Sequence, residues 1–344
     1  MAEKETGSNP VSGDGTVAPA ISVVICSFNR AASLEAAIES VIAQQESIPV
    51  PFEILVIDDG STDDTDQIVR GFEWTSAVSV RYIKESGKGI ATARNRGVEE
   101  AIGEWIAFFD DDQIAEQEWL NELFFTAKRT GADIVGGVRR LQFVHPDPPS
   151  LGPLTREILG EKYYGSDMRR SDRHSLACTG NVLLHREVFN QIGLFDTKMV
   201  RGMSDIDLTR RALDASISSW YAPRAIVNHL IPKYRLREDY IKWTCLRVGT
   251  NLVYINYKSW GLLKTLFPCL VRTGHALTLN PLMAIAARIK GDRETTLDRK
   301  CYRWIAQGCL RMALHFLFPG IFRQKAFFDR LEFRVPRNQT LKNN

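Results

Sequence analysis

Three apolar runs in the first third of the chain each end in a cluster of polar or acidic side chains. The runs are Ile21–Cys26, Phe52–Ile57 and Trp105–Phe109, and the clusters that follow them are Ser27–Asn29, Asp58-Asp59 and Asp110–Asp112. Short runs of β-branched, aliphatic and aromatic residues predict buried strands. Ligands bind beyond the carboxyl ends of the strands in open α/β sheets, so this repeated order predicts a site at one sheet edge.

Segments with helical periodicity separate these runs. Leu34, Ile38, Val41 and Ile42 fall on one face of a helix expected over Ser33–Gln44. The other expected elements of this half are helices over Asp63–Gly71, Gly89–Ala101 (with Ala91, Val98 and Ile102 facing inward) and Glu116–Thr130, and strands over Val78–Ile83 and Asp133–Val138. The alternation predicts an α/β fold with a largely parallel, Rossmann-like sheet flanked by helices.

The second half is less regular. The proline-containing segment Arg139–Ser175 has little periodicity and is expected to be a functional loop. Beyond it, order resumes with the stretch Leu176–His185, helices over Arg186–Ile192 and Asp205–Ala215, and a strand near Ala225–His229. The expected domains are a disordered leader over 1–19 that lacks the apolar core of a secretory signal, a catalytic domain over 20–230, a basic helical region over 231–330 and a tail over 331–344.

The charge of the chain is unevenly distributed. Residues 231–344 carry 21 Lys and Arg against 7 Asp and Glu, a net charge of +14, whereas the preceding residues carry a net charge of −11. Basic residues interrupt apolar stretches such as Trp260–Val271, Thr273–Ala287 and Met312–Phe322, none of which is long enough to span a bilayer. This pattern favours helices that lie on an anionic membrane surface or re-enter it, with an ordinary basic helical subdomain as the alternative. No nucleic-acid-binding motif accompanies the charge, so nucleic acid is not an expected partner.

The six cysteines are scattered and form no CxxC pair. Their spacing argues against a zinc site or a disulfide framework, and it is typical of a protein from a reducing compartment.

The acidic run Asp110–Asp112 carries the strongest chemical signal. Three adjacent carboxylates repel one another unless a cation neutralises them, and Mg²⁺ or Mn²⁺ bound by one or two carboxylates completes its shell with substrate phosphates. The alternative is a solvated acidic turn that caps the following helix. Asp58-Asp59, taken alone, is equally consistent with a strand-to-helix turn.

Four stretches resemble glycosyltransferase family 2 enzymes with a GT-A fold. They are ISVVICSFNR, EILVIDDGSTDDT, GKGIATARNRGVEEAIGEWIAFFDDD and CTGNVLLHREVFNQIGLFDTKMVRGMSDIDLTRRA, which together cover about Ile21 to His229 in the family's order and spacing. The catalytic domain followed by a basic helical region looks like bacterial enzymes that extend lipid-linked exopolysaccharide units, such as succinoglycan glucosyltransferases.

The resemblance implies roles for individual residues. It places Asp59 on a uracil base, Asp111 on the ribose or the metal, and Asp112 on the divalent cation that binds the donor diphosphate. The other residues expected at the donor are Ser27, Asn29, Asp58, Lys88, Arg94 and Asp110, and the expected metal ligands are Asp112, Asp110 and His229. His229 has a purely structural alternative, and Thr179–Asn181 matches the family's acceptor-facing loop.

Asp205 is the expected general base, because it occupies the second position of the family's acidic pair before a helix. The first acid of that pair is replaced here by Ser204. A competing interpretation makes Ser204 an N-cap, with Asp205 and Asp207 in the first helical turn, where the helix dipole favours acids.

The expected function is therefore metal-dependent, inverting transfer of a sugar from a nucleotide-sugar, most often a UDP-sugar in this family, to a hydroxyl group of a glycan. The expected acceptor is carried on a polyprenyl diphosphate, and the expected location is the cytoplasmic side of the bacterial inner membrane. A nucleotidyltransferase acting on a sugar phosphate and an inactive membrane-attached scaffold are the alternatives. The sequence alone does not identify the donor sugar, the acceptor or the linkage.

Overall fold

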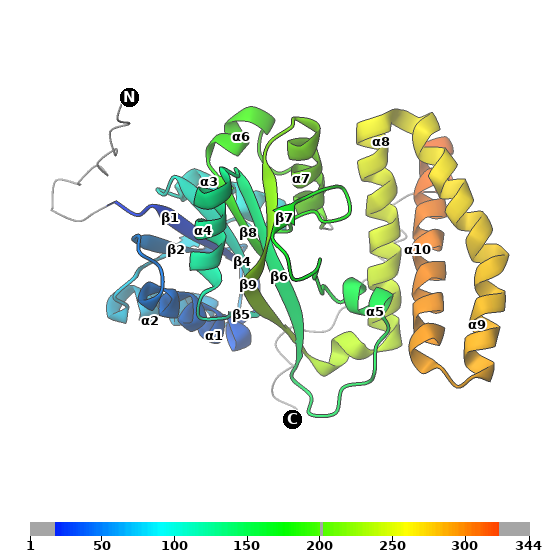
Figure 1. Cartoon of the computed structure of the whole chain (residues 1–344), viewed down its shortest axis with the longest axis horizontal. Helices are drawn as coiled ribbons and strands as arrows, with labels where there is room; N and C mark the ends of the chain where they lie inside the picture. Colours follow the sequence, from blue (N-terminus) through cyan, green and yellow to red (C-terminus); the bar gives the residue numbers. More distant parts are fainter. Residues whose placement is uncertain (1–17, 200–201, 323–344) are drawn as a thin grey trace. The chain divides into compact units, whose positions relative to one another are not determined.

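A computed structural model describes residues 18–199 and 202–322, which form two compact units (Figure 1). Unit 1 comprises residues 18–139, 163–199 and 204–228, and unit 2 comprises residues 140–162, 202–203 and 229–322. Most of the expected leader and the whole of the expected tail lie outside the described residues.

A mixed sheet forms the centre of unit 1. Within the described residues the strand order is β3 (Ser79–Lys84), β2 (Phe52–Asp58), β1 (Ile21–Ser27), β4 (Trp105–Asp110), β8 (Asn181–His185), β6 (Ile134–Phe143), β9 (Ser219–Ile231) and β5 (Gln113–Ala115), with β7 (Arg169–Arg170) paired to β9. The first four strands are parallel, whereas β8 is antiparallel to both β4 and β6. The expected fold class, an α/β protein with a mixed sheet, is confirmed.

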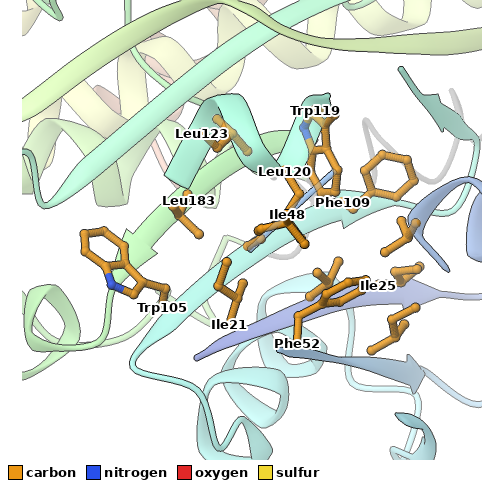
Figure 2. Close-up of a cluster of buried hydrophobic side chains, with 14 of the residues drawn as sticks. Ile21, Ile25, Ile48, Phe52, Trp105, Phe109, Trp119, Leu120, Leu123 and Leu183 are labelled. Atoms are coloured by element: carbon orange, nitrogen blue, oxygen red, sulfur yellow. The ribbon is translucent and has the colours of Figure 1, made fainter. Parts of the chain in front are cut away.

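Helices cover both faces of this sheet. One buried cluster joins the strands to α1 (Ala31–Ile42), α2 (Thr65–Thr75) and α4 (Trp119–Thr130), and the other joins them to α3 (Ile90–Glu100), α6 (Glu187–Ile192) and α7 (Ser204–Asp214). Figure 2 shows part of the first cluster, which contains Ile21, Ile25 and Phe52 of the strands together with Trp119 and Leu120 of α4. The near-continuous apolar character of β1 and β2 follows from this burial on both faces.

Two local expectations are corrected by the structure. Ile102 is 60% exposed, because α3 ends at Glu100 and the chain has left the helical path by that point. Arg139–Ser175 is not a structureless loop, since it contains the end of β6, the short helix α5 (Pro153–Ile158) and β7.

Unit 2 is built mainly from helices. Its main elements are α5, α8 (Glu238–Leu277), α9 (Leu279–Ile289) and α10 (Arg293–Leu317). Glycines let α8 and α10 approach closely: a Cβ atom on Gly249 would lie 2.1 Å from the Ile305 carbonyl oxygen, and one on Gly308 would lie 2.3 Å from that of Leu246. The core of the unit includes four cysteines, Cys245, Cys269, Cys301 and Cys309, all of them free thiols.

No helix among the described residues combines the length and the apolar character needed to cross a membrane.

Candidate active site

The polar clusters that follow the strands of unit 1 meet at one edge of the sheet. In the parallel register, Ser27 of β1 lies beside Asp58 of β2, and Cys26 lies beside Asp110 of β4. The chain therefore brings Ser27, Asp58 and Asp110 to neighbouring positions, as the sequence predicts.

Asn29 and Asp58 connect the loops at this edge. Asn29 adopts a left-handed conformation (φ 52°), its Oδ1 accepts a hydrogen bond from the Thr62 N–H (2.8 Å), and its own N–H donates to Ser61 Oγ (2.9 Å). The buried Asp58 carboxylate accepts from the Ser61 N–H (2.8 Å) and from the Tyr82 hydroxyl (2.6 Å). These contacts give both residues a part in shaping the loops.

Asp59 links the loop after β2 to the start of α3. Its carboxylate accepts a hydrogen bond from the Gly89 N–H (3.0 Å to Oδ2), and burial raises the pKa of this carboxyl while the Gly89 N–H opposes that shift. Gly60 and Gly87 both have positive φ, and a Cβ atom on Gly60 would lie 3.4 Å from the Gly87 Cα, so the two loops pack backbone to backbone. Lys88 is exposed in the second of these loops.

Each outer carboxylate of Asp110–Asp112 has an arginine neighbour. Arg139 Nη1 lies 3.6 Å from Asp110 Oδ2, and Arg30 Nη1 lies 3.7 Å from Asp112 Oδ2. Burial raises the pKa of Asp111 to about 7, with Arg30 opposing this shift and Asp112 reinforcing it. The run is therefore a partly buried charge cluster, not a solvated turn.

Arg139 is the cation at the centre of this cluster. Its side chain is only 12% exposed. Burial lowers the pKa of the guanidinium, but ionisable neighbours raise it above its ordinary value. Those neighbours are Cys178, Asp110, Asp205 and Asp112. Arg139 thus interacts electrostatically both with carboxylates at the strand edge and with the expected base.

Gly180 allows this cluster to form. A Cβ atom there would lie 2.4 Å from Arg139 Nη1 and 2.5 Å from Asp110 Oδ2, closer than real Cβ contacts allow. The neighbouring Thr179 faces the expected base, because its N–H and its hydroxyl each lie 3.4 Å from Asp205 Oδ2. Asn181 of the same segment is structural: its Oδ1 accepts from Trp119 Nε1 (2.8 Å), and its amide donates to the Val138 and Ala225 carbonyls.

Asp205 lies in the first turn of α7, as the sequence predicts. The expected N-cap is wrong, since Ser204 is the first helical residue and is preceded by Met203 with φ 65°. The Ser204 hydroxyl instead accepts a hydrogen bond from Arg94 Nη1 (3.1 Å), and the buried Arg94 guanidinium also lies over the Phe195 ring. Arg94 thereby holds the start of the helix that carries Asp205.

Asp207 and His229 have well-defined partners. Asp207 accepts from Arg211 Nε one turn later (3.0 Å), so its carboxylate forms an ion pair along α7. His229 belongs to unit 2, where its Nε2 accepts from Arg235 Nη1 (2.7 Å). Any metal bond from His229 would therefore come from Nδ1.

The donor set at Asp110–Asp112 suits an open metal site. Within residues 18–199 and 202–322, no three His, Cys, Asp or Glu side chains converge closely enough to enclose an ion by themselves. Mg²⁺ and Mn²⁺ are commonly bound by one or two carboxylates together with substrate phosphates, so a closed protein cage is not required. Burial, reinforced by the neighbouring Asp112 and Asp110 carboxylates, raises the pKa of Asp111, and a bound cation would favour the ionised form of this carboxyl. The residues present therefore fit a hard divalent cation shared with a ligand.

Sequence reasoning missed Arg30, Arg139 and Gln113, whose Nε2 lies 3.4 Å from Asp110 Oδ2. Arg30 and Gln113 each directly follow a predicted polar cluster, and that adjacency is a usable signal. Arg139 carries no comparable local signal, because its partners are distant in the sequence.

The Glycosyl transferase family 2 model matches residues 22–193. The chain is 30% identical over 212 residues to the Glycosyltransferase AglE of Haloferax volcanii, covering 61% of this chain and 67% of that protein. It is 28% identical over 239 residues to the Glucosyl-dolichyl phosphate glucuronosyltransferase of the same organism, covering 64% of this chain and 72% of that protein. The crystal structure of S. aureus TarS 1-349 in complex with UDP matches with a TM-score of 0.46 and 14% identity, covering 86% of this chain and 91% of that one.

Proposed function

The chain belongs to glycosyl transferase family 2, and we propose that it is a metal-dependent, inverting enzyme that moves a sugar from a UDP-sugar to a hydroxyl group of a lipid-linked glycan. Sugar transfer from a nucleotide-sugar is the activity of the family. Membership sets aside the nucleotidyltransferase, and the presence of Asp59, Asp111, Asp112 and Asp205 together argues against an inactive scaffold. The UDP donor, the metal, the inverting course and the acceptor are the parts of this statement that we propose.

One observation carries the proposal: Arg139 lies 3.6 Å from Asp110 and packs beside Gly180, and the adjacent Thr179 lies 3.4 Å from Asp205. Asp205 is accordingly among the carboxylates that raise the pKa of the Arg139 guanidinium. A transferase needs a group that stabilises the departing diphosphate and a base that takes the proton of the incoming hydroxyl, both acting on one anomeric carbon. Asp110 and Asp112 belong to the strand edge where the donor is expected, and Asp205, in the first turn of α7, is also an electrostatic neighbour of Arg139. This arrangement supports a donor and a base that share one centre.

The proposed chemistry begins at Asp205. Its carboxylate takes the proton from the acceptor hydroxyl while that oxygen attacks the anomeric carbon, and the bond from this carbon to the diphosphate oxygen breaks on the opposite face. The electron pair of the broken bond leaves with the nucleoside diphosphate. Thr179 orients the base through its N–H and its hydroxyl, and Arg94 fixes the helix turn through Ser204.

Asp112 and Asp110 would hold the divalent cation, with His229 Nδ1 as a further proposed ligand. When bound, such a cation supplies positive charge to the diphosphate as the leaving group forms. Arg30 and Arg139 are the protein's own cations beside the same carboxylates. Asp59, Lys88, Asp111, Ser27 and Asn29 remain our proposed donor contacts.

The acceptor assignment rests on two supports. One relative is named as a glucosyl-dolichyl phosphate glucuronosyltransferase, and the last third of this chain is strongly basic. Both favour an acceptor carried by a polyprenyl lipid at the cytoplasmic side of a membrane.

The test is release of nucleoside diphosphate from a panel of UDP-sugars, measured with Mn²⁺ or Mg²⁺ and with excess chelator. We expect turnover with one sugar, its loss in chelator, and loss of most turnover in Asp112→Asn with the fold intact. Full activity in excess chelator would contradict the metal assignment. A parallel panel of nucleotide-sugars with other bases tests the donor: turnover of one of these, with no turnover of any UDP-sugar, would contradict the UDP assignment.

A further inference from the structure

The second half of α8 and the whole of α9 expose a large set of apolar side chains. A break at Gly261 (φ 74°) separates this half of α8 from the first. The exposed side chains are Leu263, Phe267, Leu270, Val271, Leu277, Leu279, Leu282, Met283, Ile285 and Ile289, which we call the apolar face. Leu263 and Ile289 are 83% and 80% exposed, so this is not a partly covered core. Isolated surface leucines are ordinary, but a contiguous set on two consecutive helices is typical of a binding surface.

The apolar face lies opposite the side that packs inside unit 2. In the second half of α8 the buried positions are Thr265, Cys269 and Ala276, and in α9 they are Asn280 and Ala287. Both helices pack against α10, and Asn280 Nδ2 donates to the Arg299 carbonyl there (3.0 Å). A helix of a water-soluble protein normally buries its larger apolar side chains and exposes polar ones. Here the buried residues are small or polar, Leu266 from this half of α8 packs partly buried against the core of unit 2, and the large residues of the apolar face are exposed.

Cations accompany the apolar face, and carboxylates are nearly absent from it. Between Tyr257 and Arg293 the basic residues are Lys258, Lys264, Arg272, Arg288, Lys290 and Arg293, whereas the sole acidic residue is Asp292. Lys264 and Arg288 are exposed on the same helices, and Lys290 is exposed directly after α9. An apolar face bordered by cations complements a bilayer with anionic headgroups, which attract the cations while the apolar side chains enter the boundary with the acyl chains. A second copy of the chain would place like charges against each other, so self-association is disfavoured.

The length of α9 determines whether this helix can cross a bilayer or only lie on it. At about 1.5 Å per residue, the 11 residues of α9 extend for about 16 Å, far less than the roughly 30 Å of a hydrocarbon core. We propose that the second half of α8 together with α9 is an in-plane docking surface for an anionic lipid bilayer. This assignment does not depend on the transfer reaction, since vesicle binding is measured without donor or acceptor.

The test is sedimentation of the full-length protein with vesicles of phosphatidylcholine alone or mixed with phosphatidylglycerol. We expect binding to the anionic vesicles, released only in part by high salt, because salt screens the charges and leaves the apolar contribution. The triple variant Leu263→Gln/Phe267→Gln/Leu270→Gln should bind roughly tenfold or more weakly to both kinds of vesicle. The double variant Lys264→Glu/Lys290→Glu should lose roughly tenfold or more on the anionic vesicles alone.

Unit 1 offers a matched control. Trp74 and Phe125 are 86% and 54% exposed there, so Trp74→Gln/Phe125→Gln removes comparable apolar surface and should leave vesicle binding unchanged. Nucleotide release and thermal melting of the triple variant should match the parent, which separates failure of this proposal from failure of the proposed function. The proposal is overturned if the parent protein binds neither vesicle, or if the triple variant and the control bind equally. A second copy of the chain is the other possible occupant of the apolar face. If the parent protein is a dimer that does not bind vesicles, and the triple variant is a monomer, the apolar face is a dimer interface and the proposal is overturned.

Discussion

Arg139 shows how one residue is defined by its neighbours. A guanidinium that is 12% exposed loses much of its hydration, and only nearby carboxylates make this position tolerable. Asp110, Asp112 and Asp205 supply that compensation, and Gly180 supplies the space. Carboxylates of the strand edge and the proposed base are therefore both among the charged neighbours of this one residue. We infer that Arg139 is a positioning residue of the proposed reaction.

Asp205→Asn should remove the proposed base while keeping the shape of the side chain. We expect kcat to fall by roughly 10²–10⁴, the range typical of lost general-base catalysis, and UDP affinity to stay nearly intact. Steady-state kinetics and calorimetric titration with UDP measure the two effects separately. A loss confined to the donor KM would make Asp205 a binding residue.

Arg139→Gln should lower kcat by roughly tenfold or more, because carboxylates at the centre of the site lose their shared cation. Arg139→Lys should recover part of this loss, since it restores the charge without the planar fork of donors. Arg140→Gln is the matched control, because Arg140 is exposed and adjacent residues of a strand point to opposite faces. Equal activity of the Gln and Lys variants would show that charge at this position is irrelevant.

At the scale of elements, the short helix α5 depends for its stability on a side chain that is distant in the sequence. The six-residue helix α5 is too short to be stable in isolation. Asp298 of α10 stabilises its first turn, where the carboxylate accepts from the Leu154 N–H (3.0 Å), the Thr155 N–H (2.8 Å) and the Thr155 hydroxyl (2.6 Å). A side chain from another helix thus performs the role of an N-cap.

Asp298→Ala should destabilise unit 2 by about 1–3 kcal/mol, because two backbone N–H groups at the start of α5 lose their acceptor. Urea unfolding monitored by circular dichroism measures the change. Asp298→Asn retains one acceptor oxygen and should lose less. If the Ala and Asn variants unfold at the same urea concentration as the parent, the carboxylate is not an effective cap.

At the scale of the whole molecule, the two units have different surface chemistries. Unit 1 collects carboxylates and arginines at a strand edge, whereas unit 2 carries the apolar face and most of the excess positive charge. The first suits a nucleotide-sugar, and the second suits a lipid surface. Both features are consistent with our proposal that the enzyme takes its donor from solution and its acceptor from a membrane.

This division predicts a dependence on how the acceptor is presented. With a polyprenyl-diphosphate-linked glycan embedded in anionic vesicles, the triple variant of the apolar face should turn over roughly tenfold or more slowly than the parent. With the same acceptor in detergent micelles, the two proteins should be equally active. Product formation followed by mass spectrometry measures both. If the parent and the triple variant turn over the vesicle-embedded acceptor at equal rates, docking through the apolar face does not contribute to acceptor use.

The sequence by itself determined the strand edge. Apolar runs specify which segments are buried strands, and parallel pairing brings their ends together, so Ser27, Asp58 and Asp110 were correctly predicted to meet. The position of Asp205 in the first turn of a helix was also predicted, because the start of a helix depends on the residues around it in the sequence. The amphipathic character of the basic region was also visible, since it depends on composition and short-range periodicity.

Only the tertiary structure decided which distant residues complete the site. The contact of Arg94 with Ser204 and that of Arg139 with Asp110 join segments whose separation in the sequence is arbitrary, and no local pattern encodes them. The same holds for Gly180, which looks like any loop glycine until its neighbours are known. The direction of the apolar face was likewise undetermined, because periodicity shows that a helix has two sides but not which of them packs against α10. Local propensity and burial are properties of a segment, whereas a charge cluster is a property of the folded chain.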